Sequence, residues 1–311
     1  MSFTITTDMR PSLLGLFLSL FTFHFALSTF SQTLLVPATG SPQQPHFNPA
    51  FIARNSVAEV KGQLHVKREG EPMVPKNEHY WYRFDSNGLA WYSNNSFGRP
   101  GSGRDTASIG YRYDGQGNLL QRTRLDLSGH YSEEFELDSL GRPVRETHVR
   151  IENLGTDRYT LVPGTRTEVS DEHFRYDALN DSTKRITYLN SLGLPYREEL
   201  HISDRLGYLR AIEDRYLVSN RMGRTTFTYN EKGLLASRTE QSDLSVPRTV
   251  RYSYTYDAAD NLLGMDTWQN DKHVTKEEYV YAEGSLHLKA KLTKDMATGT
   301  IRVVRYEVIK R

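Results

Sequence analysis

The sequence predicts an all-β protein: an antiparallel meander of repeated β-hairpins that forms a curved sheet, a ribbon or a partial shell. Three observations lead to this prediction. A short aromatic phrase recurs along the chain, each copy runs into turn-forming residues, and apolar residues follow most of the turns. No amphipathic helix longer than about two turns is evident.

The repeated phrase is an aromatic residue, any residue, a second aromatic residue, Asp or Asn, two further residues and Gly. The clearest copies are Tyr82-Arg83-Phe84-Asp85 with Gly88, Tyr111-Arg112-Tyr113-Asp114 with Gly117, and Phe227-Thr228-Tyr229-Asn230 with Gly233. Close variants are Phe174-Arg175-Tyr176-Asp177 with Asn180, Tyr254-Thr255-Tyr256-Asp257 with Asp260, and Phe135-Glu136-Leu137-Asp138 with Gly141. Weaker copies centre on Asn190 with Gly193, Asp204 with Gly207, and Tyr279-Val280-Tyr281 with Gly284.

Each copy has the chemistry of a strand that ends in a turn. Residues two apart in a strand share a face, so the aromatic pair lies on one side of a sheet. Asp or Asn accepts hydrogen bonds from backbone amides ahead of it, and Gly tolerates the positive φ of a short hairpin loop. Asn180 and Asp260 replace Gly in two copies, and both residue types tolerate the left-handed region. We therefore interpret each copy as a β-hairpin.

The outgoing strand of a hairpin begins with apolar residues, and an Arg follows in most copies: Arg122, Arg145, Arg185, Arg197, Arg210 and Arg238. An isolated hairpin cannot bury its apolar face in water. Neighbouring copies are therefore expected to stack edge to edge, or to wrap into an open or closed curved sheet.

The rest of the chain is divided by composition. The predicted units are a signal peptide at 1–31, a Pro-rich linker at 32–50, an N-terminal strand or cap at 51–78, the hairpin repeats at 79–290 and a terminal hairpin strand at 291–311. The signal peptide is indicated by Arg10, the uncharged apolar run from Leu13 to Leu27 and small residues after it. We expect an exported protein in the periplasm, outside the cell or at its surface.

Overall composition excludes several classes of function. The formal net charge is +1, which gives no basic footprint for nucleic acid. The chain has no cysteine, so disulfides, thiolate metal sites and a cysteine nucleophile are excluded. No second apolar segment follows the signal peptide, so we predict no integral membrane span in the mature chain. A membrane barrel is disfavoured because the predicted strands often carry Arg, Glu and Lys.

The phrase, as it stands at Tyr111 to Leu119 and at Tyr254 to Leu262, resembles the YD repeat of Rhs proteins and their relatives, which include insecticidal toxin complexes and teneurins. The resemblance covers residues 79–285. It implies a β-sheet ribbon that spirals into a shell around a cargo, and it implies carbohydrate binding, which has been ascribed to some members. No toxin domain or self-cleaving segment is evident before Arg311.

Candidate catalytic and metal sites are weak. The loop from Gly98 to Asp105 has the glycines of a phosphate loop but lacks its Lys and the helix that should follow. The histidines have no metal-ligand spacing, and the adjacent glutamates of one strand face opposite ways. We predict no catalytic residue, no metal and no cofactor.

The repeat tyrosines are expected to stabilise the sheet across strands. The better candidates for a contact surface interrupt the repeat phrase or lie in the glycine-rich loop: Tyr80, Trp81, Trp91, Tyr92, Arg99 and Arg104. We therefore predict a secreted or cell-surface binding or scaffolding protein that engages an unknown glycan or protein. The alternative is an exported hydrolase whose acids or histidines come together across the sheet.

Overall fold

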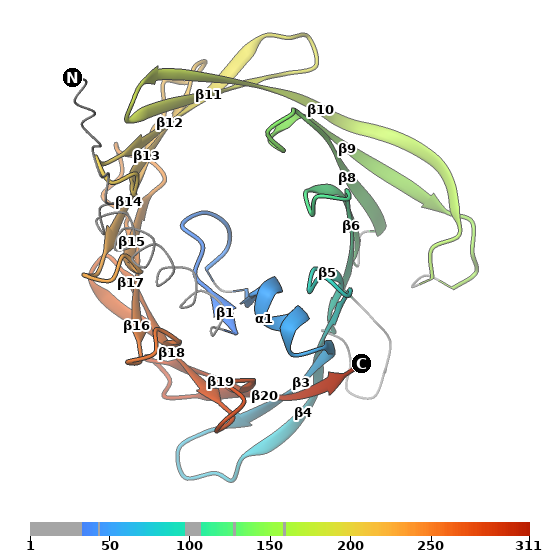
Figure 1. The fold of residues 1–311 in the computed structure, drawn as a ribbon, viewed down its shortest axis with the longest axis vertical. Coiled ribbons are helices and arrows are strands. Elements are labelled where there is room, and N and C mark those ends of the chain that lie inside the picture. The colour runs from blue at the N-terminus through green and yellow to red at the C-terminus, as the bar shows by residue number, and fades with distance from the viewer. Residues whose placement is uncertain (1–32, 43, 97–106, 127–128, 158–159) are drawn as a thin grey trace, which may run out of the picture.

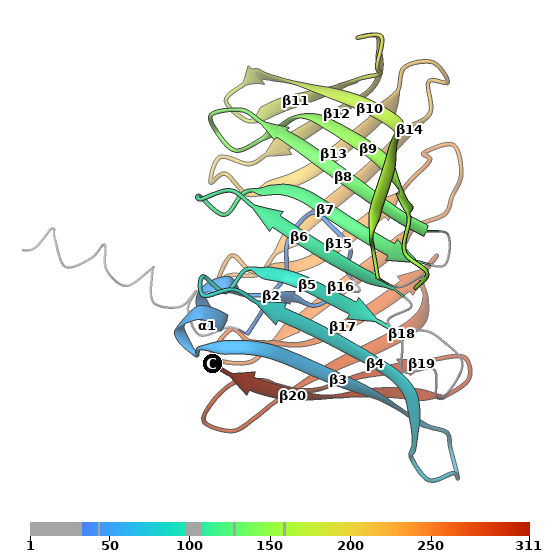
Figure 2. The ribbon, with the colours of Figure 1, turned by 90° about the vertical axis from the view of Figure 1, so that its right-hand side faces the viewer.

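The computed structural model describes residues 33–42, 44–96, 107–126, 129–157 and 160–311. In this part of the chain 18 strands form one closed antiparallel barrel (Figures 1 and 2). Each strand pairs with its neighbours in sequence, and β20 (Ile301–Lys310) pairs with β3 (Val57–Lys67) to close the ring. The predicted antiparallel meander of hairpins is confirmed, and closure leaves the barrel that these described residues form without a free edge.

The strands between these two run in sequence order around the wall. The first half consists of β4 (Val74–Phe84), β5 (Ala90–Asn95), β6 (Ser108–Tyr113), β7 (Leu119–Asp126), β8 (Gly129–Leu137), β9 (Pro143–Asn153), β10 (Pro163–Asn180) and β11 (Thr183–Leu189). The second half consists of β12 (Pro195–Ser203), β13 (Leu209–Tyr216), β14 (Met222–Tyr229), β15 (Leu235–Gln241), β16 (Val250–Tyr256), β17 (Leu262–Gln269), β18 (Lys272–Tyr281) and β19 (Leu288–Asp295).

The repeated phrase builds one kind of turn. Oδ1 of Asp114 accepts hydrogen bonds from the backbone N–H groups of Gln116 and Asn118, both at 2.8 Å. Gly117 has a φ of 87°, and its N–H donates to the Asp114 carbonyl at 3.2 Å. This is a type I turn closed by a glycine bulge. The same pattern recurs at Asp85, Asp138, Asn190, Asp204, Asn230 and Asp257.

The two copies without glycine behave differently. Asp260 takes a φ of 68°, as its place in the turn requires. The left-handed conformation predicted for Asn180 is wrong, because Asn180 does not have a positive φ. Strand β10 instead continues past Asp177, whose carboxylate meets Arg185 across the hairpin at 3.0 Å. The chain turns after Asn180, whose Oδ1 accepts a hydrogen bond from the N–H of Ser182.

The second aromatic of the phrase ties its hairpin to the one before it. Oη of Tyr256 donates to the carbonyl of Leu235, two residues after the preceding turn glycine, at 2.8 Å. Equivalent bonds join Tyr113 to Ala90, Tyr176 to Pro143, Tyr229 to Leu209 and Tyr281 to Leu262, at 2.7 to 3.0 Å. Burial raises the pKa of Tyr113 to about 12, so this phenol keeps its proton at neutral pH.

The segment predicted as an extended linker lies inside the ring instead. Strands β1 (Leu34–Leu35) and β2 (His46–Phe47) form their own two-stranded sheet there (Figure 1). Leu34 is 3% exposed and packs with Tyr254, Met265 and Tyr279 of the barrel wall. A chain of this composition can be extended in water, but its apolar residues are covered here by the tyrosine face of the wall.

The region predicted as a strand or cap contains a short helix, α1 (Pro49–Arg54), and then β3. Oδ1 of Asn48 caps the helix by accepting from the N–H of Ala50, and proline occupies the first helical turn. Phe51 and Ile52 are buried against Val60 and Phe84 of the wall. We call residues 33–42 and 44–54 the plug. Its helix α1 lies at one end of the barrel (Figure 2).

The predicted signal peptide, residues 1–31, lies outside the described residues. Within the described ranges the structure has no helix with the length and hydropathy needed to cross a bilayer.

Two turn glycines offer a direct test of the hairpin assignment. A Cβ at Gly193 or at Gly110 meets no atom within 4 Å, but only Gly193 has a positive φ, of 72°. We expect Gly193→Ala to lower the free energy of unfolding by about 1–2 kcal/mol, the cost of the left-handed region for an L-residue. Gly110→Ala should cause no such loss in the same urea titration, and equal losses would contradict the assignment.

The bond between hairpins is tested by Tyr256→Phe, which keeps the ring and removes the hydroxyl. The carbonyl of Leu235 loses its partner, so we expect a loss of about 1 kcal/mol in chemical denaturation. Tyr131→Phe is the control, since the contacts that the structure shows for Tyr131 are made by its ring, to His148 and Arg124. A similar loss in both variants would show that the tie between hairpins is not what Tyr256 contributes.

Candidate functional site

Three of the six predicted contact residues meet on the outer face of the barrel. Trp81, Trp91 and Tyr92 surround the guanidinium of Arg83, which lies 3.7, 5.5 and 5.4 Å from the three ring centroids. We call these four residues the outer aromatic cluster. Trp81 and Arg83 face outward because Tyr82 and Phe84, which alternate with them along β4, pack against the plug. Tyr92 shares this face because it is the cross-strand partner of Arg83 on β5.

A carboxylate holds this cluster together. Glu59 on β3 accepts a hydrogen bond from Nε1 of Trp81 at 3.1 Å and lies 3.4 Å from Nε of Arg83. Lys61 lies 5.1 Å from the centroid of Trp81, so that indole has a cation of its own chain on each of two sides. Trp91, at 43% exposed, is the ring most available to a ligand. Most of the cluster therefore stabilises the sheet, in the manner of cation–π pairs.

The remaining predicted residues do not join this cluster. Tyr80 points into the barrel, where its hydroxyl donates to Glu78 at 3.2 Å and burial raises its pKa. Arg99 and Arg104 lie outside the described residues.

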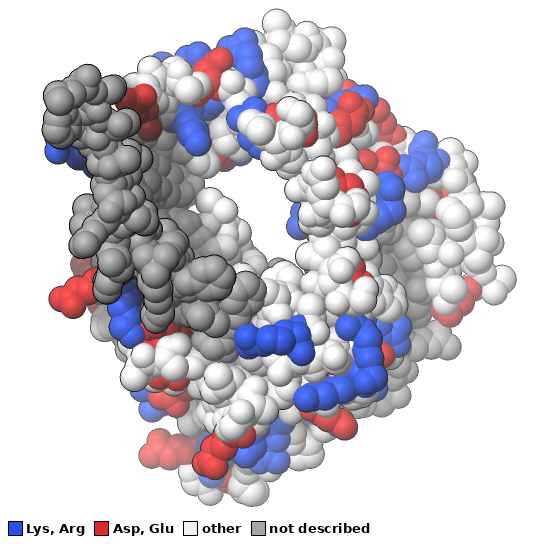
Figure 3. Space-filling model, in the orientation of Figure 1, with Lys and Arg blue, Asp and Glu red and all other residues white. Residues whose placement is uncertain are grey.

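The lumen is the second candidate surface. Figure 3 shows that the ring stays hollow beside the plug when all atoms are drawn. The plug packs on the arc of wall from β14 through β20 to β3 and β4, whereas the inner faces of β6 to β13 border the hollow part (Figure 1). We call the space along β6 to β13 the open half of the lumen.

A polar network lines the open half on β12 and β13. Arg197 donates from Nε to Asp214 at 2.8 Å and also contacts Glu199, which in turn contacts Nε2 of His201 at 3.0 Å. His201 faces inward because it is paired with Ile212, which packs against the apolar core that Leu34 of the plug forms with the wall. Burial alone would raise the pKa of Glu199, but the hydrogen bond from His201 and the charge of Arg197 lower it overall. Glu199 is therefore ionised at neutral pH.

Aromatic rings flank this network. The guanidinium of Arg197 lies 4.5 Å from the ring centroid of Tyr188 and 5.6 Å from that of Tyr216. Aromatic faces beside fixed donors and acceptors form a surface that can contact both the carbon and the hydroxyl sides of a sugar, or a polar peptide.

Three carboxylates line β8, β9 and β10 in the same half. Glu133 forms an ion pair with Arg122, and Glu146 is directly opposite Glu172 across the strands. Burial is the main cause that raises the pKa of Glu146, and repulsion from Glu133 and Glu172 raises it further. Like charges opposite each other destabilise a sheet, so the ionised form of this pair is unfavourable.

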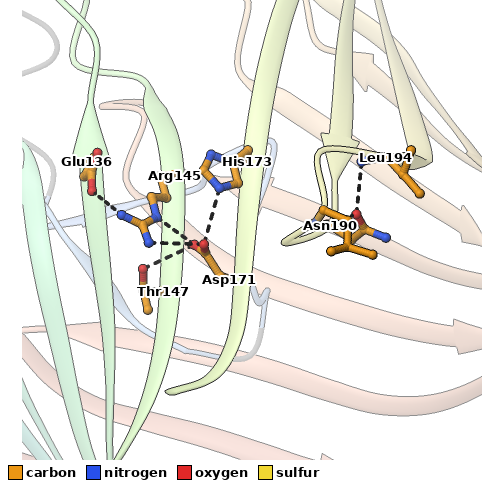
Figure 4. Close-up of polar contacts among 8 residues, drawn as sticks. Glu136, Arg145, Thr147, Asp171, His173, Asn190 and Leu194 are labelled. Atoms are coloured by element: carbon orange, nitrogen blue, oxygen red, sulfur yellow. Dashed lines mark hydrogen bonds and ion pairs between the residues drawn. The ribbon is translucent and has the colours of Figure 1, made fainter. Parts of the chain in front are cut away.

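The outward face of the same strands carries a different ladder (Figure 4). Arg145 donates to Asp171 at 2.7 Å and to Glu136 at 2.9 Å, and His173 lies 3.3 Å from Asp171. These groups satisfy one another across β8, β9 and β10. Among the described residues no group of three or more His, Asp or Glu side chains has the arrangement of a metal site.

The sequence signal for the lumen network is the Arg that follows a turn glycine, but its spacing from the glycine does not show which face of the sheet it occupies. Arg145 and Arg197 both occupy the position four residues after a turn glycine, yet Arg145 faces water and Arg197 faces the lumen. The turn at Asn190 lies at the opposite rim from the turn at Asp138, because successive turns of a meander alternate between rims and Asn190 joins β11 to β12, whereas Asp138 joins β8 to β9. A copy at the opposite rim presents its residues to the opposite face.

Comparison with known proteins does not establish a family. No protein-family model and no curated protein matches the chain. A porin-like protein from Bacteroides uniformis is similar over 81% of this chain and 98% of its own, at 13% identity and a TM-score of 0.38. A porin-like protein from Bacteroides vulgatus is similar over 79% of this chain and 97% of its own, at 12% identity and a TM-score of 0.31. The Tc holotoxin pore of Photorhabdus luminescens matches over 76% of this chain but 15% of its own, with 12% identity and a TM-score of 0.28. Scores this low do not establish a shared fold.

The carboxylate pair of the open half predicts a pH dependence. The folded-state pKa of Glu146 is raised, so its ionisation destabilises the folded chain as the pH rises through that value. We expect Glu146→Gln to increase the free energy of unfolding at pH 7. The increase should disappear below about pH 4, where Glu146 is protonated in both the folded and the unfolded chain. Denaturant titrations at both pH values measure this, and a gain that is independent of pH would contradict it.

Proposed function

We propose that the protein is an exported binding or scaffolding protein that holds its ligand in the open half of the lumen. One observation carries this proposal: a hollow ring whose inner wall exposes a fixed network of Arg197, Glu199, His201 and Asp214 between tyrosine rings. These groups are held in place by one another, so a ligand would not have to order them.

The chemistry of the wall favours a hydroxylated or polar ligand, either a glycan or a polar segment of a protein. Tyrosine faces offer apolar area, while the carboxylates and guanidiniums fix hydroxyl or amide groups by charge-assisted hydrogen bonds. The outer aromatic cluster is the weaker candidate, because Lys61 and Arg83 of the same chain already lie over the ring of Trp81.

Family membership and export belong to the same proposal. The resemblance to YD repeats is supported by the part that each residue of the phrase takes: Tyr256 ties two hairpins, Asp257 orders the turn and Asp260 closes it. The predicted signal peptide supports export.

The outer face of the wall fits an aqueous surrounding. Outward ion pairs such as Arg145 with Asp171 and Arg185 with Asp177 lie on the middle strands of the ring. Placing such pairs against hydrocarbon would cost several kcal/mol each by a rough estimate.

A second candidate function is a hydrolase, and the opposition of Glu146 and Glu172 favours it. Glycosidases use two carboxylic groups on facing elements, one with a raised pKa that keeps its proton as general acid. Here Glu146 has the raised pKa, and the two acids come from adjacent strands of the concave face.

The binding proposal is tested with glycan arrays and pull-downs on three forms of the chain. We expect the unaltered chain and Trp91→Ala to retain the ligand, and Arg197→Gln to reduce binding at least about tenfold by removing charge-assisted bonds. Unfolding curves confirm that each variant is folded. Retained binding in Arg197→Gln with loss in Trp91→Ala would move the site to the outer wall and overturn the lumen proposal.

The hydrolase candidate is tested on any glycan that the arrays identify. Glu146→Gln and Glu172→Gln should each abolish release of reducing ends while binding persists. Turnover that is unchanged in both variants, or absent from the unaltered chain, would remove this candidate.

A further inference from the structure

The plug is seated in the barrel as a ligand is, and not as a strand of its wall. Strands β1 and β2 pair only with each other, at Leu34 with Phe47 and Leu35 with His46. The polar links from residues 33–47 to the wall that the structure gives are Arg238 to the carbonyl of Gly40, at 2.7 Å, and the Thr33 hydroxyl to the carbonyl of Leu286. The remaining attachment is burial of apolar side chains.

The groove beneath this segment has a defined chemistry. A small cavity of about 20 Å³ remains between the plug and the wall, and it is lined by Pro37, Pro42 and Pro45 on one side and Tyr254, Met265 and Tyr279 on the other. Proline lacks an N–H and has a fixed φ, so a proline-rich segment loses little freedom when it docks and leaves few donors unsatisfied. Aromatic grooves recognise such segments in other binding modules.

We propose that the wall groove of β16 to β19 binds proline-rich apolar segments of a partner protein, and that residues 33–47 occupy it as a built-in competitor. The groove lies apart from the open half, so this inference goes beyond the lumen ligand proposed above. Its apolar lining also disfavours the hydroxylated ligands that suit Arg197 and Glu199.

The fold permits the segment to leave without opening the barrel. Closure of the ring uses β20 and β3, and neither is formed by residues 33–47. The segment ends at α1, which remains anchored because Phe51 and Ile52 are buried and the Pro49 carbonyl sits tightly against Gly88. Residues 33–47 can therefore swing from α1 while the wall keeps its shape.

The charge pattern supports a partner with these features. Arg238 donates to a main-chain carbonyl of the plug and is paired with Glu240 at 2.7 Å. Any segment with a free carbonyl at that point can accept the same bond. Recognition would therefore rest on an apolar anchor equivalent to Leu34, on proline rings against tyrosine, and on one carbonyl at Arg238.

The experiment measures fluorescence anisotropy of a labelled peptide with the sequence of residues 33–47, added to the full chain. The built-in segment competes, so the unaltered chain should bind weakly. Leu34→Asp loosens the segment and should strengthen binding at least about tenfold, since Leu34 is 3% exposed. Leu35→Asp is the comparison variant, because Leu35 borders the same cavity but is 39% exposed, and it should strengthen binding much less than Leu34→Asp.

The peptide carries its own control, a version with Asp in place of the leucine that corresponds to Leu34, which should not bind. Absence of binding to a folded Leu34→Asp chain would overturn the proposal. A dimer that forms through exchange of residues 33–47 and excludes the peptide would assign the groove to a second copy and also overturn it.

Hydrogen exchange on the unaltered chain gives an independent answer if Leu34→Asp does not fold. Amides of residues 34–47 should exchange well before those of β16 to β19, since this segment opens while α1 and the wall stay in place. Exchange of both at one rate would mean that the plug is part of the wall's cooperative unit, and the proposal would fall.

Discussion

The barrel depends on a hydrogen bond between successive hairpins. A phenol such as that of Tyr256 reaches the carbonyl two residues beyond the previous turn, and four other tyrosines make the same contact. A single hairpin is marginal in water, so the stability of each one rests on its neighbours. Because the contact fixes where one hairpin lies on the next, it also helps to set the register with which the wall curves and closes.

Closure divides the molecule into surfaces with different chemistry. The inner face of β14 to β19 is rich in tyrosine and apolar residues and is covered by the plug. The inner face of β6 to β13 stays uncovered and carries Arg197, Glu199 and Glu146. The outer wall is dominated by ion-pair ladders such as that of Arg145 and by the outer aromatic cluster. Two inner surfaces of different chemistry within one ring follow from where the plug ends.

Much of the hairpin architecture was predictable because its causes are local. The turn at Asp114 needs only an acceptor side chain and a residue that tolerates positive φ, and both are visible in the sequence. The copy at Asp177 failed the prediction because its strand continues, and a cross-strand pair with Arg185 takes the carboxylate that would have ordered a turn. Trp81, Trp91 and Tyr92 were recognised as a group, since they lie close in sequence on one hairpin.

The sequence by itself determined the hairpins, the turns and the single sheet class of this protein, because these follow from bonds between residues a few positions apart. Only the tertiary structure decided that the ring closes, that residues 33–47 lie inside it, and that Arg197 faces the lumen while Arg145 faces water. Those outcomes depend on which rim each turn occupies and on contacts between residues separated by most of the chain. Equivalent positions of the phrase therefore reach opposite faces, and local pattern carries no record of that choice.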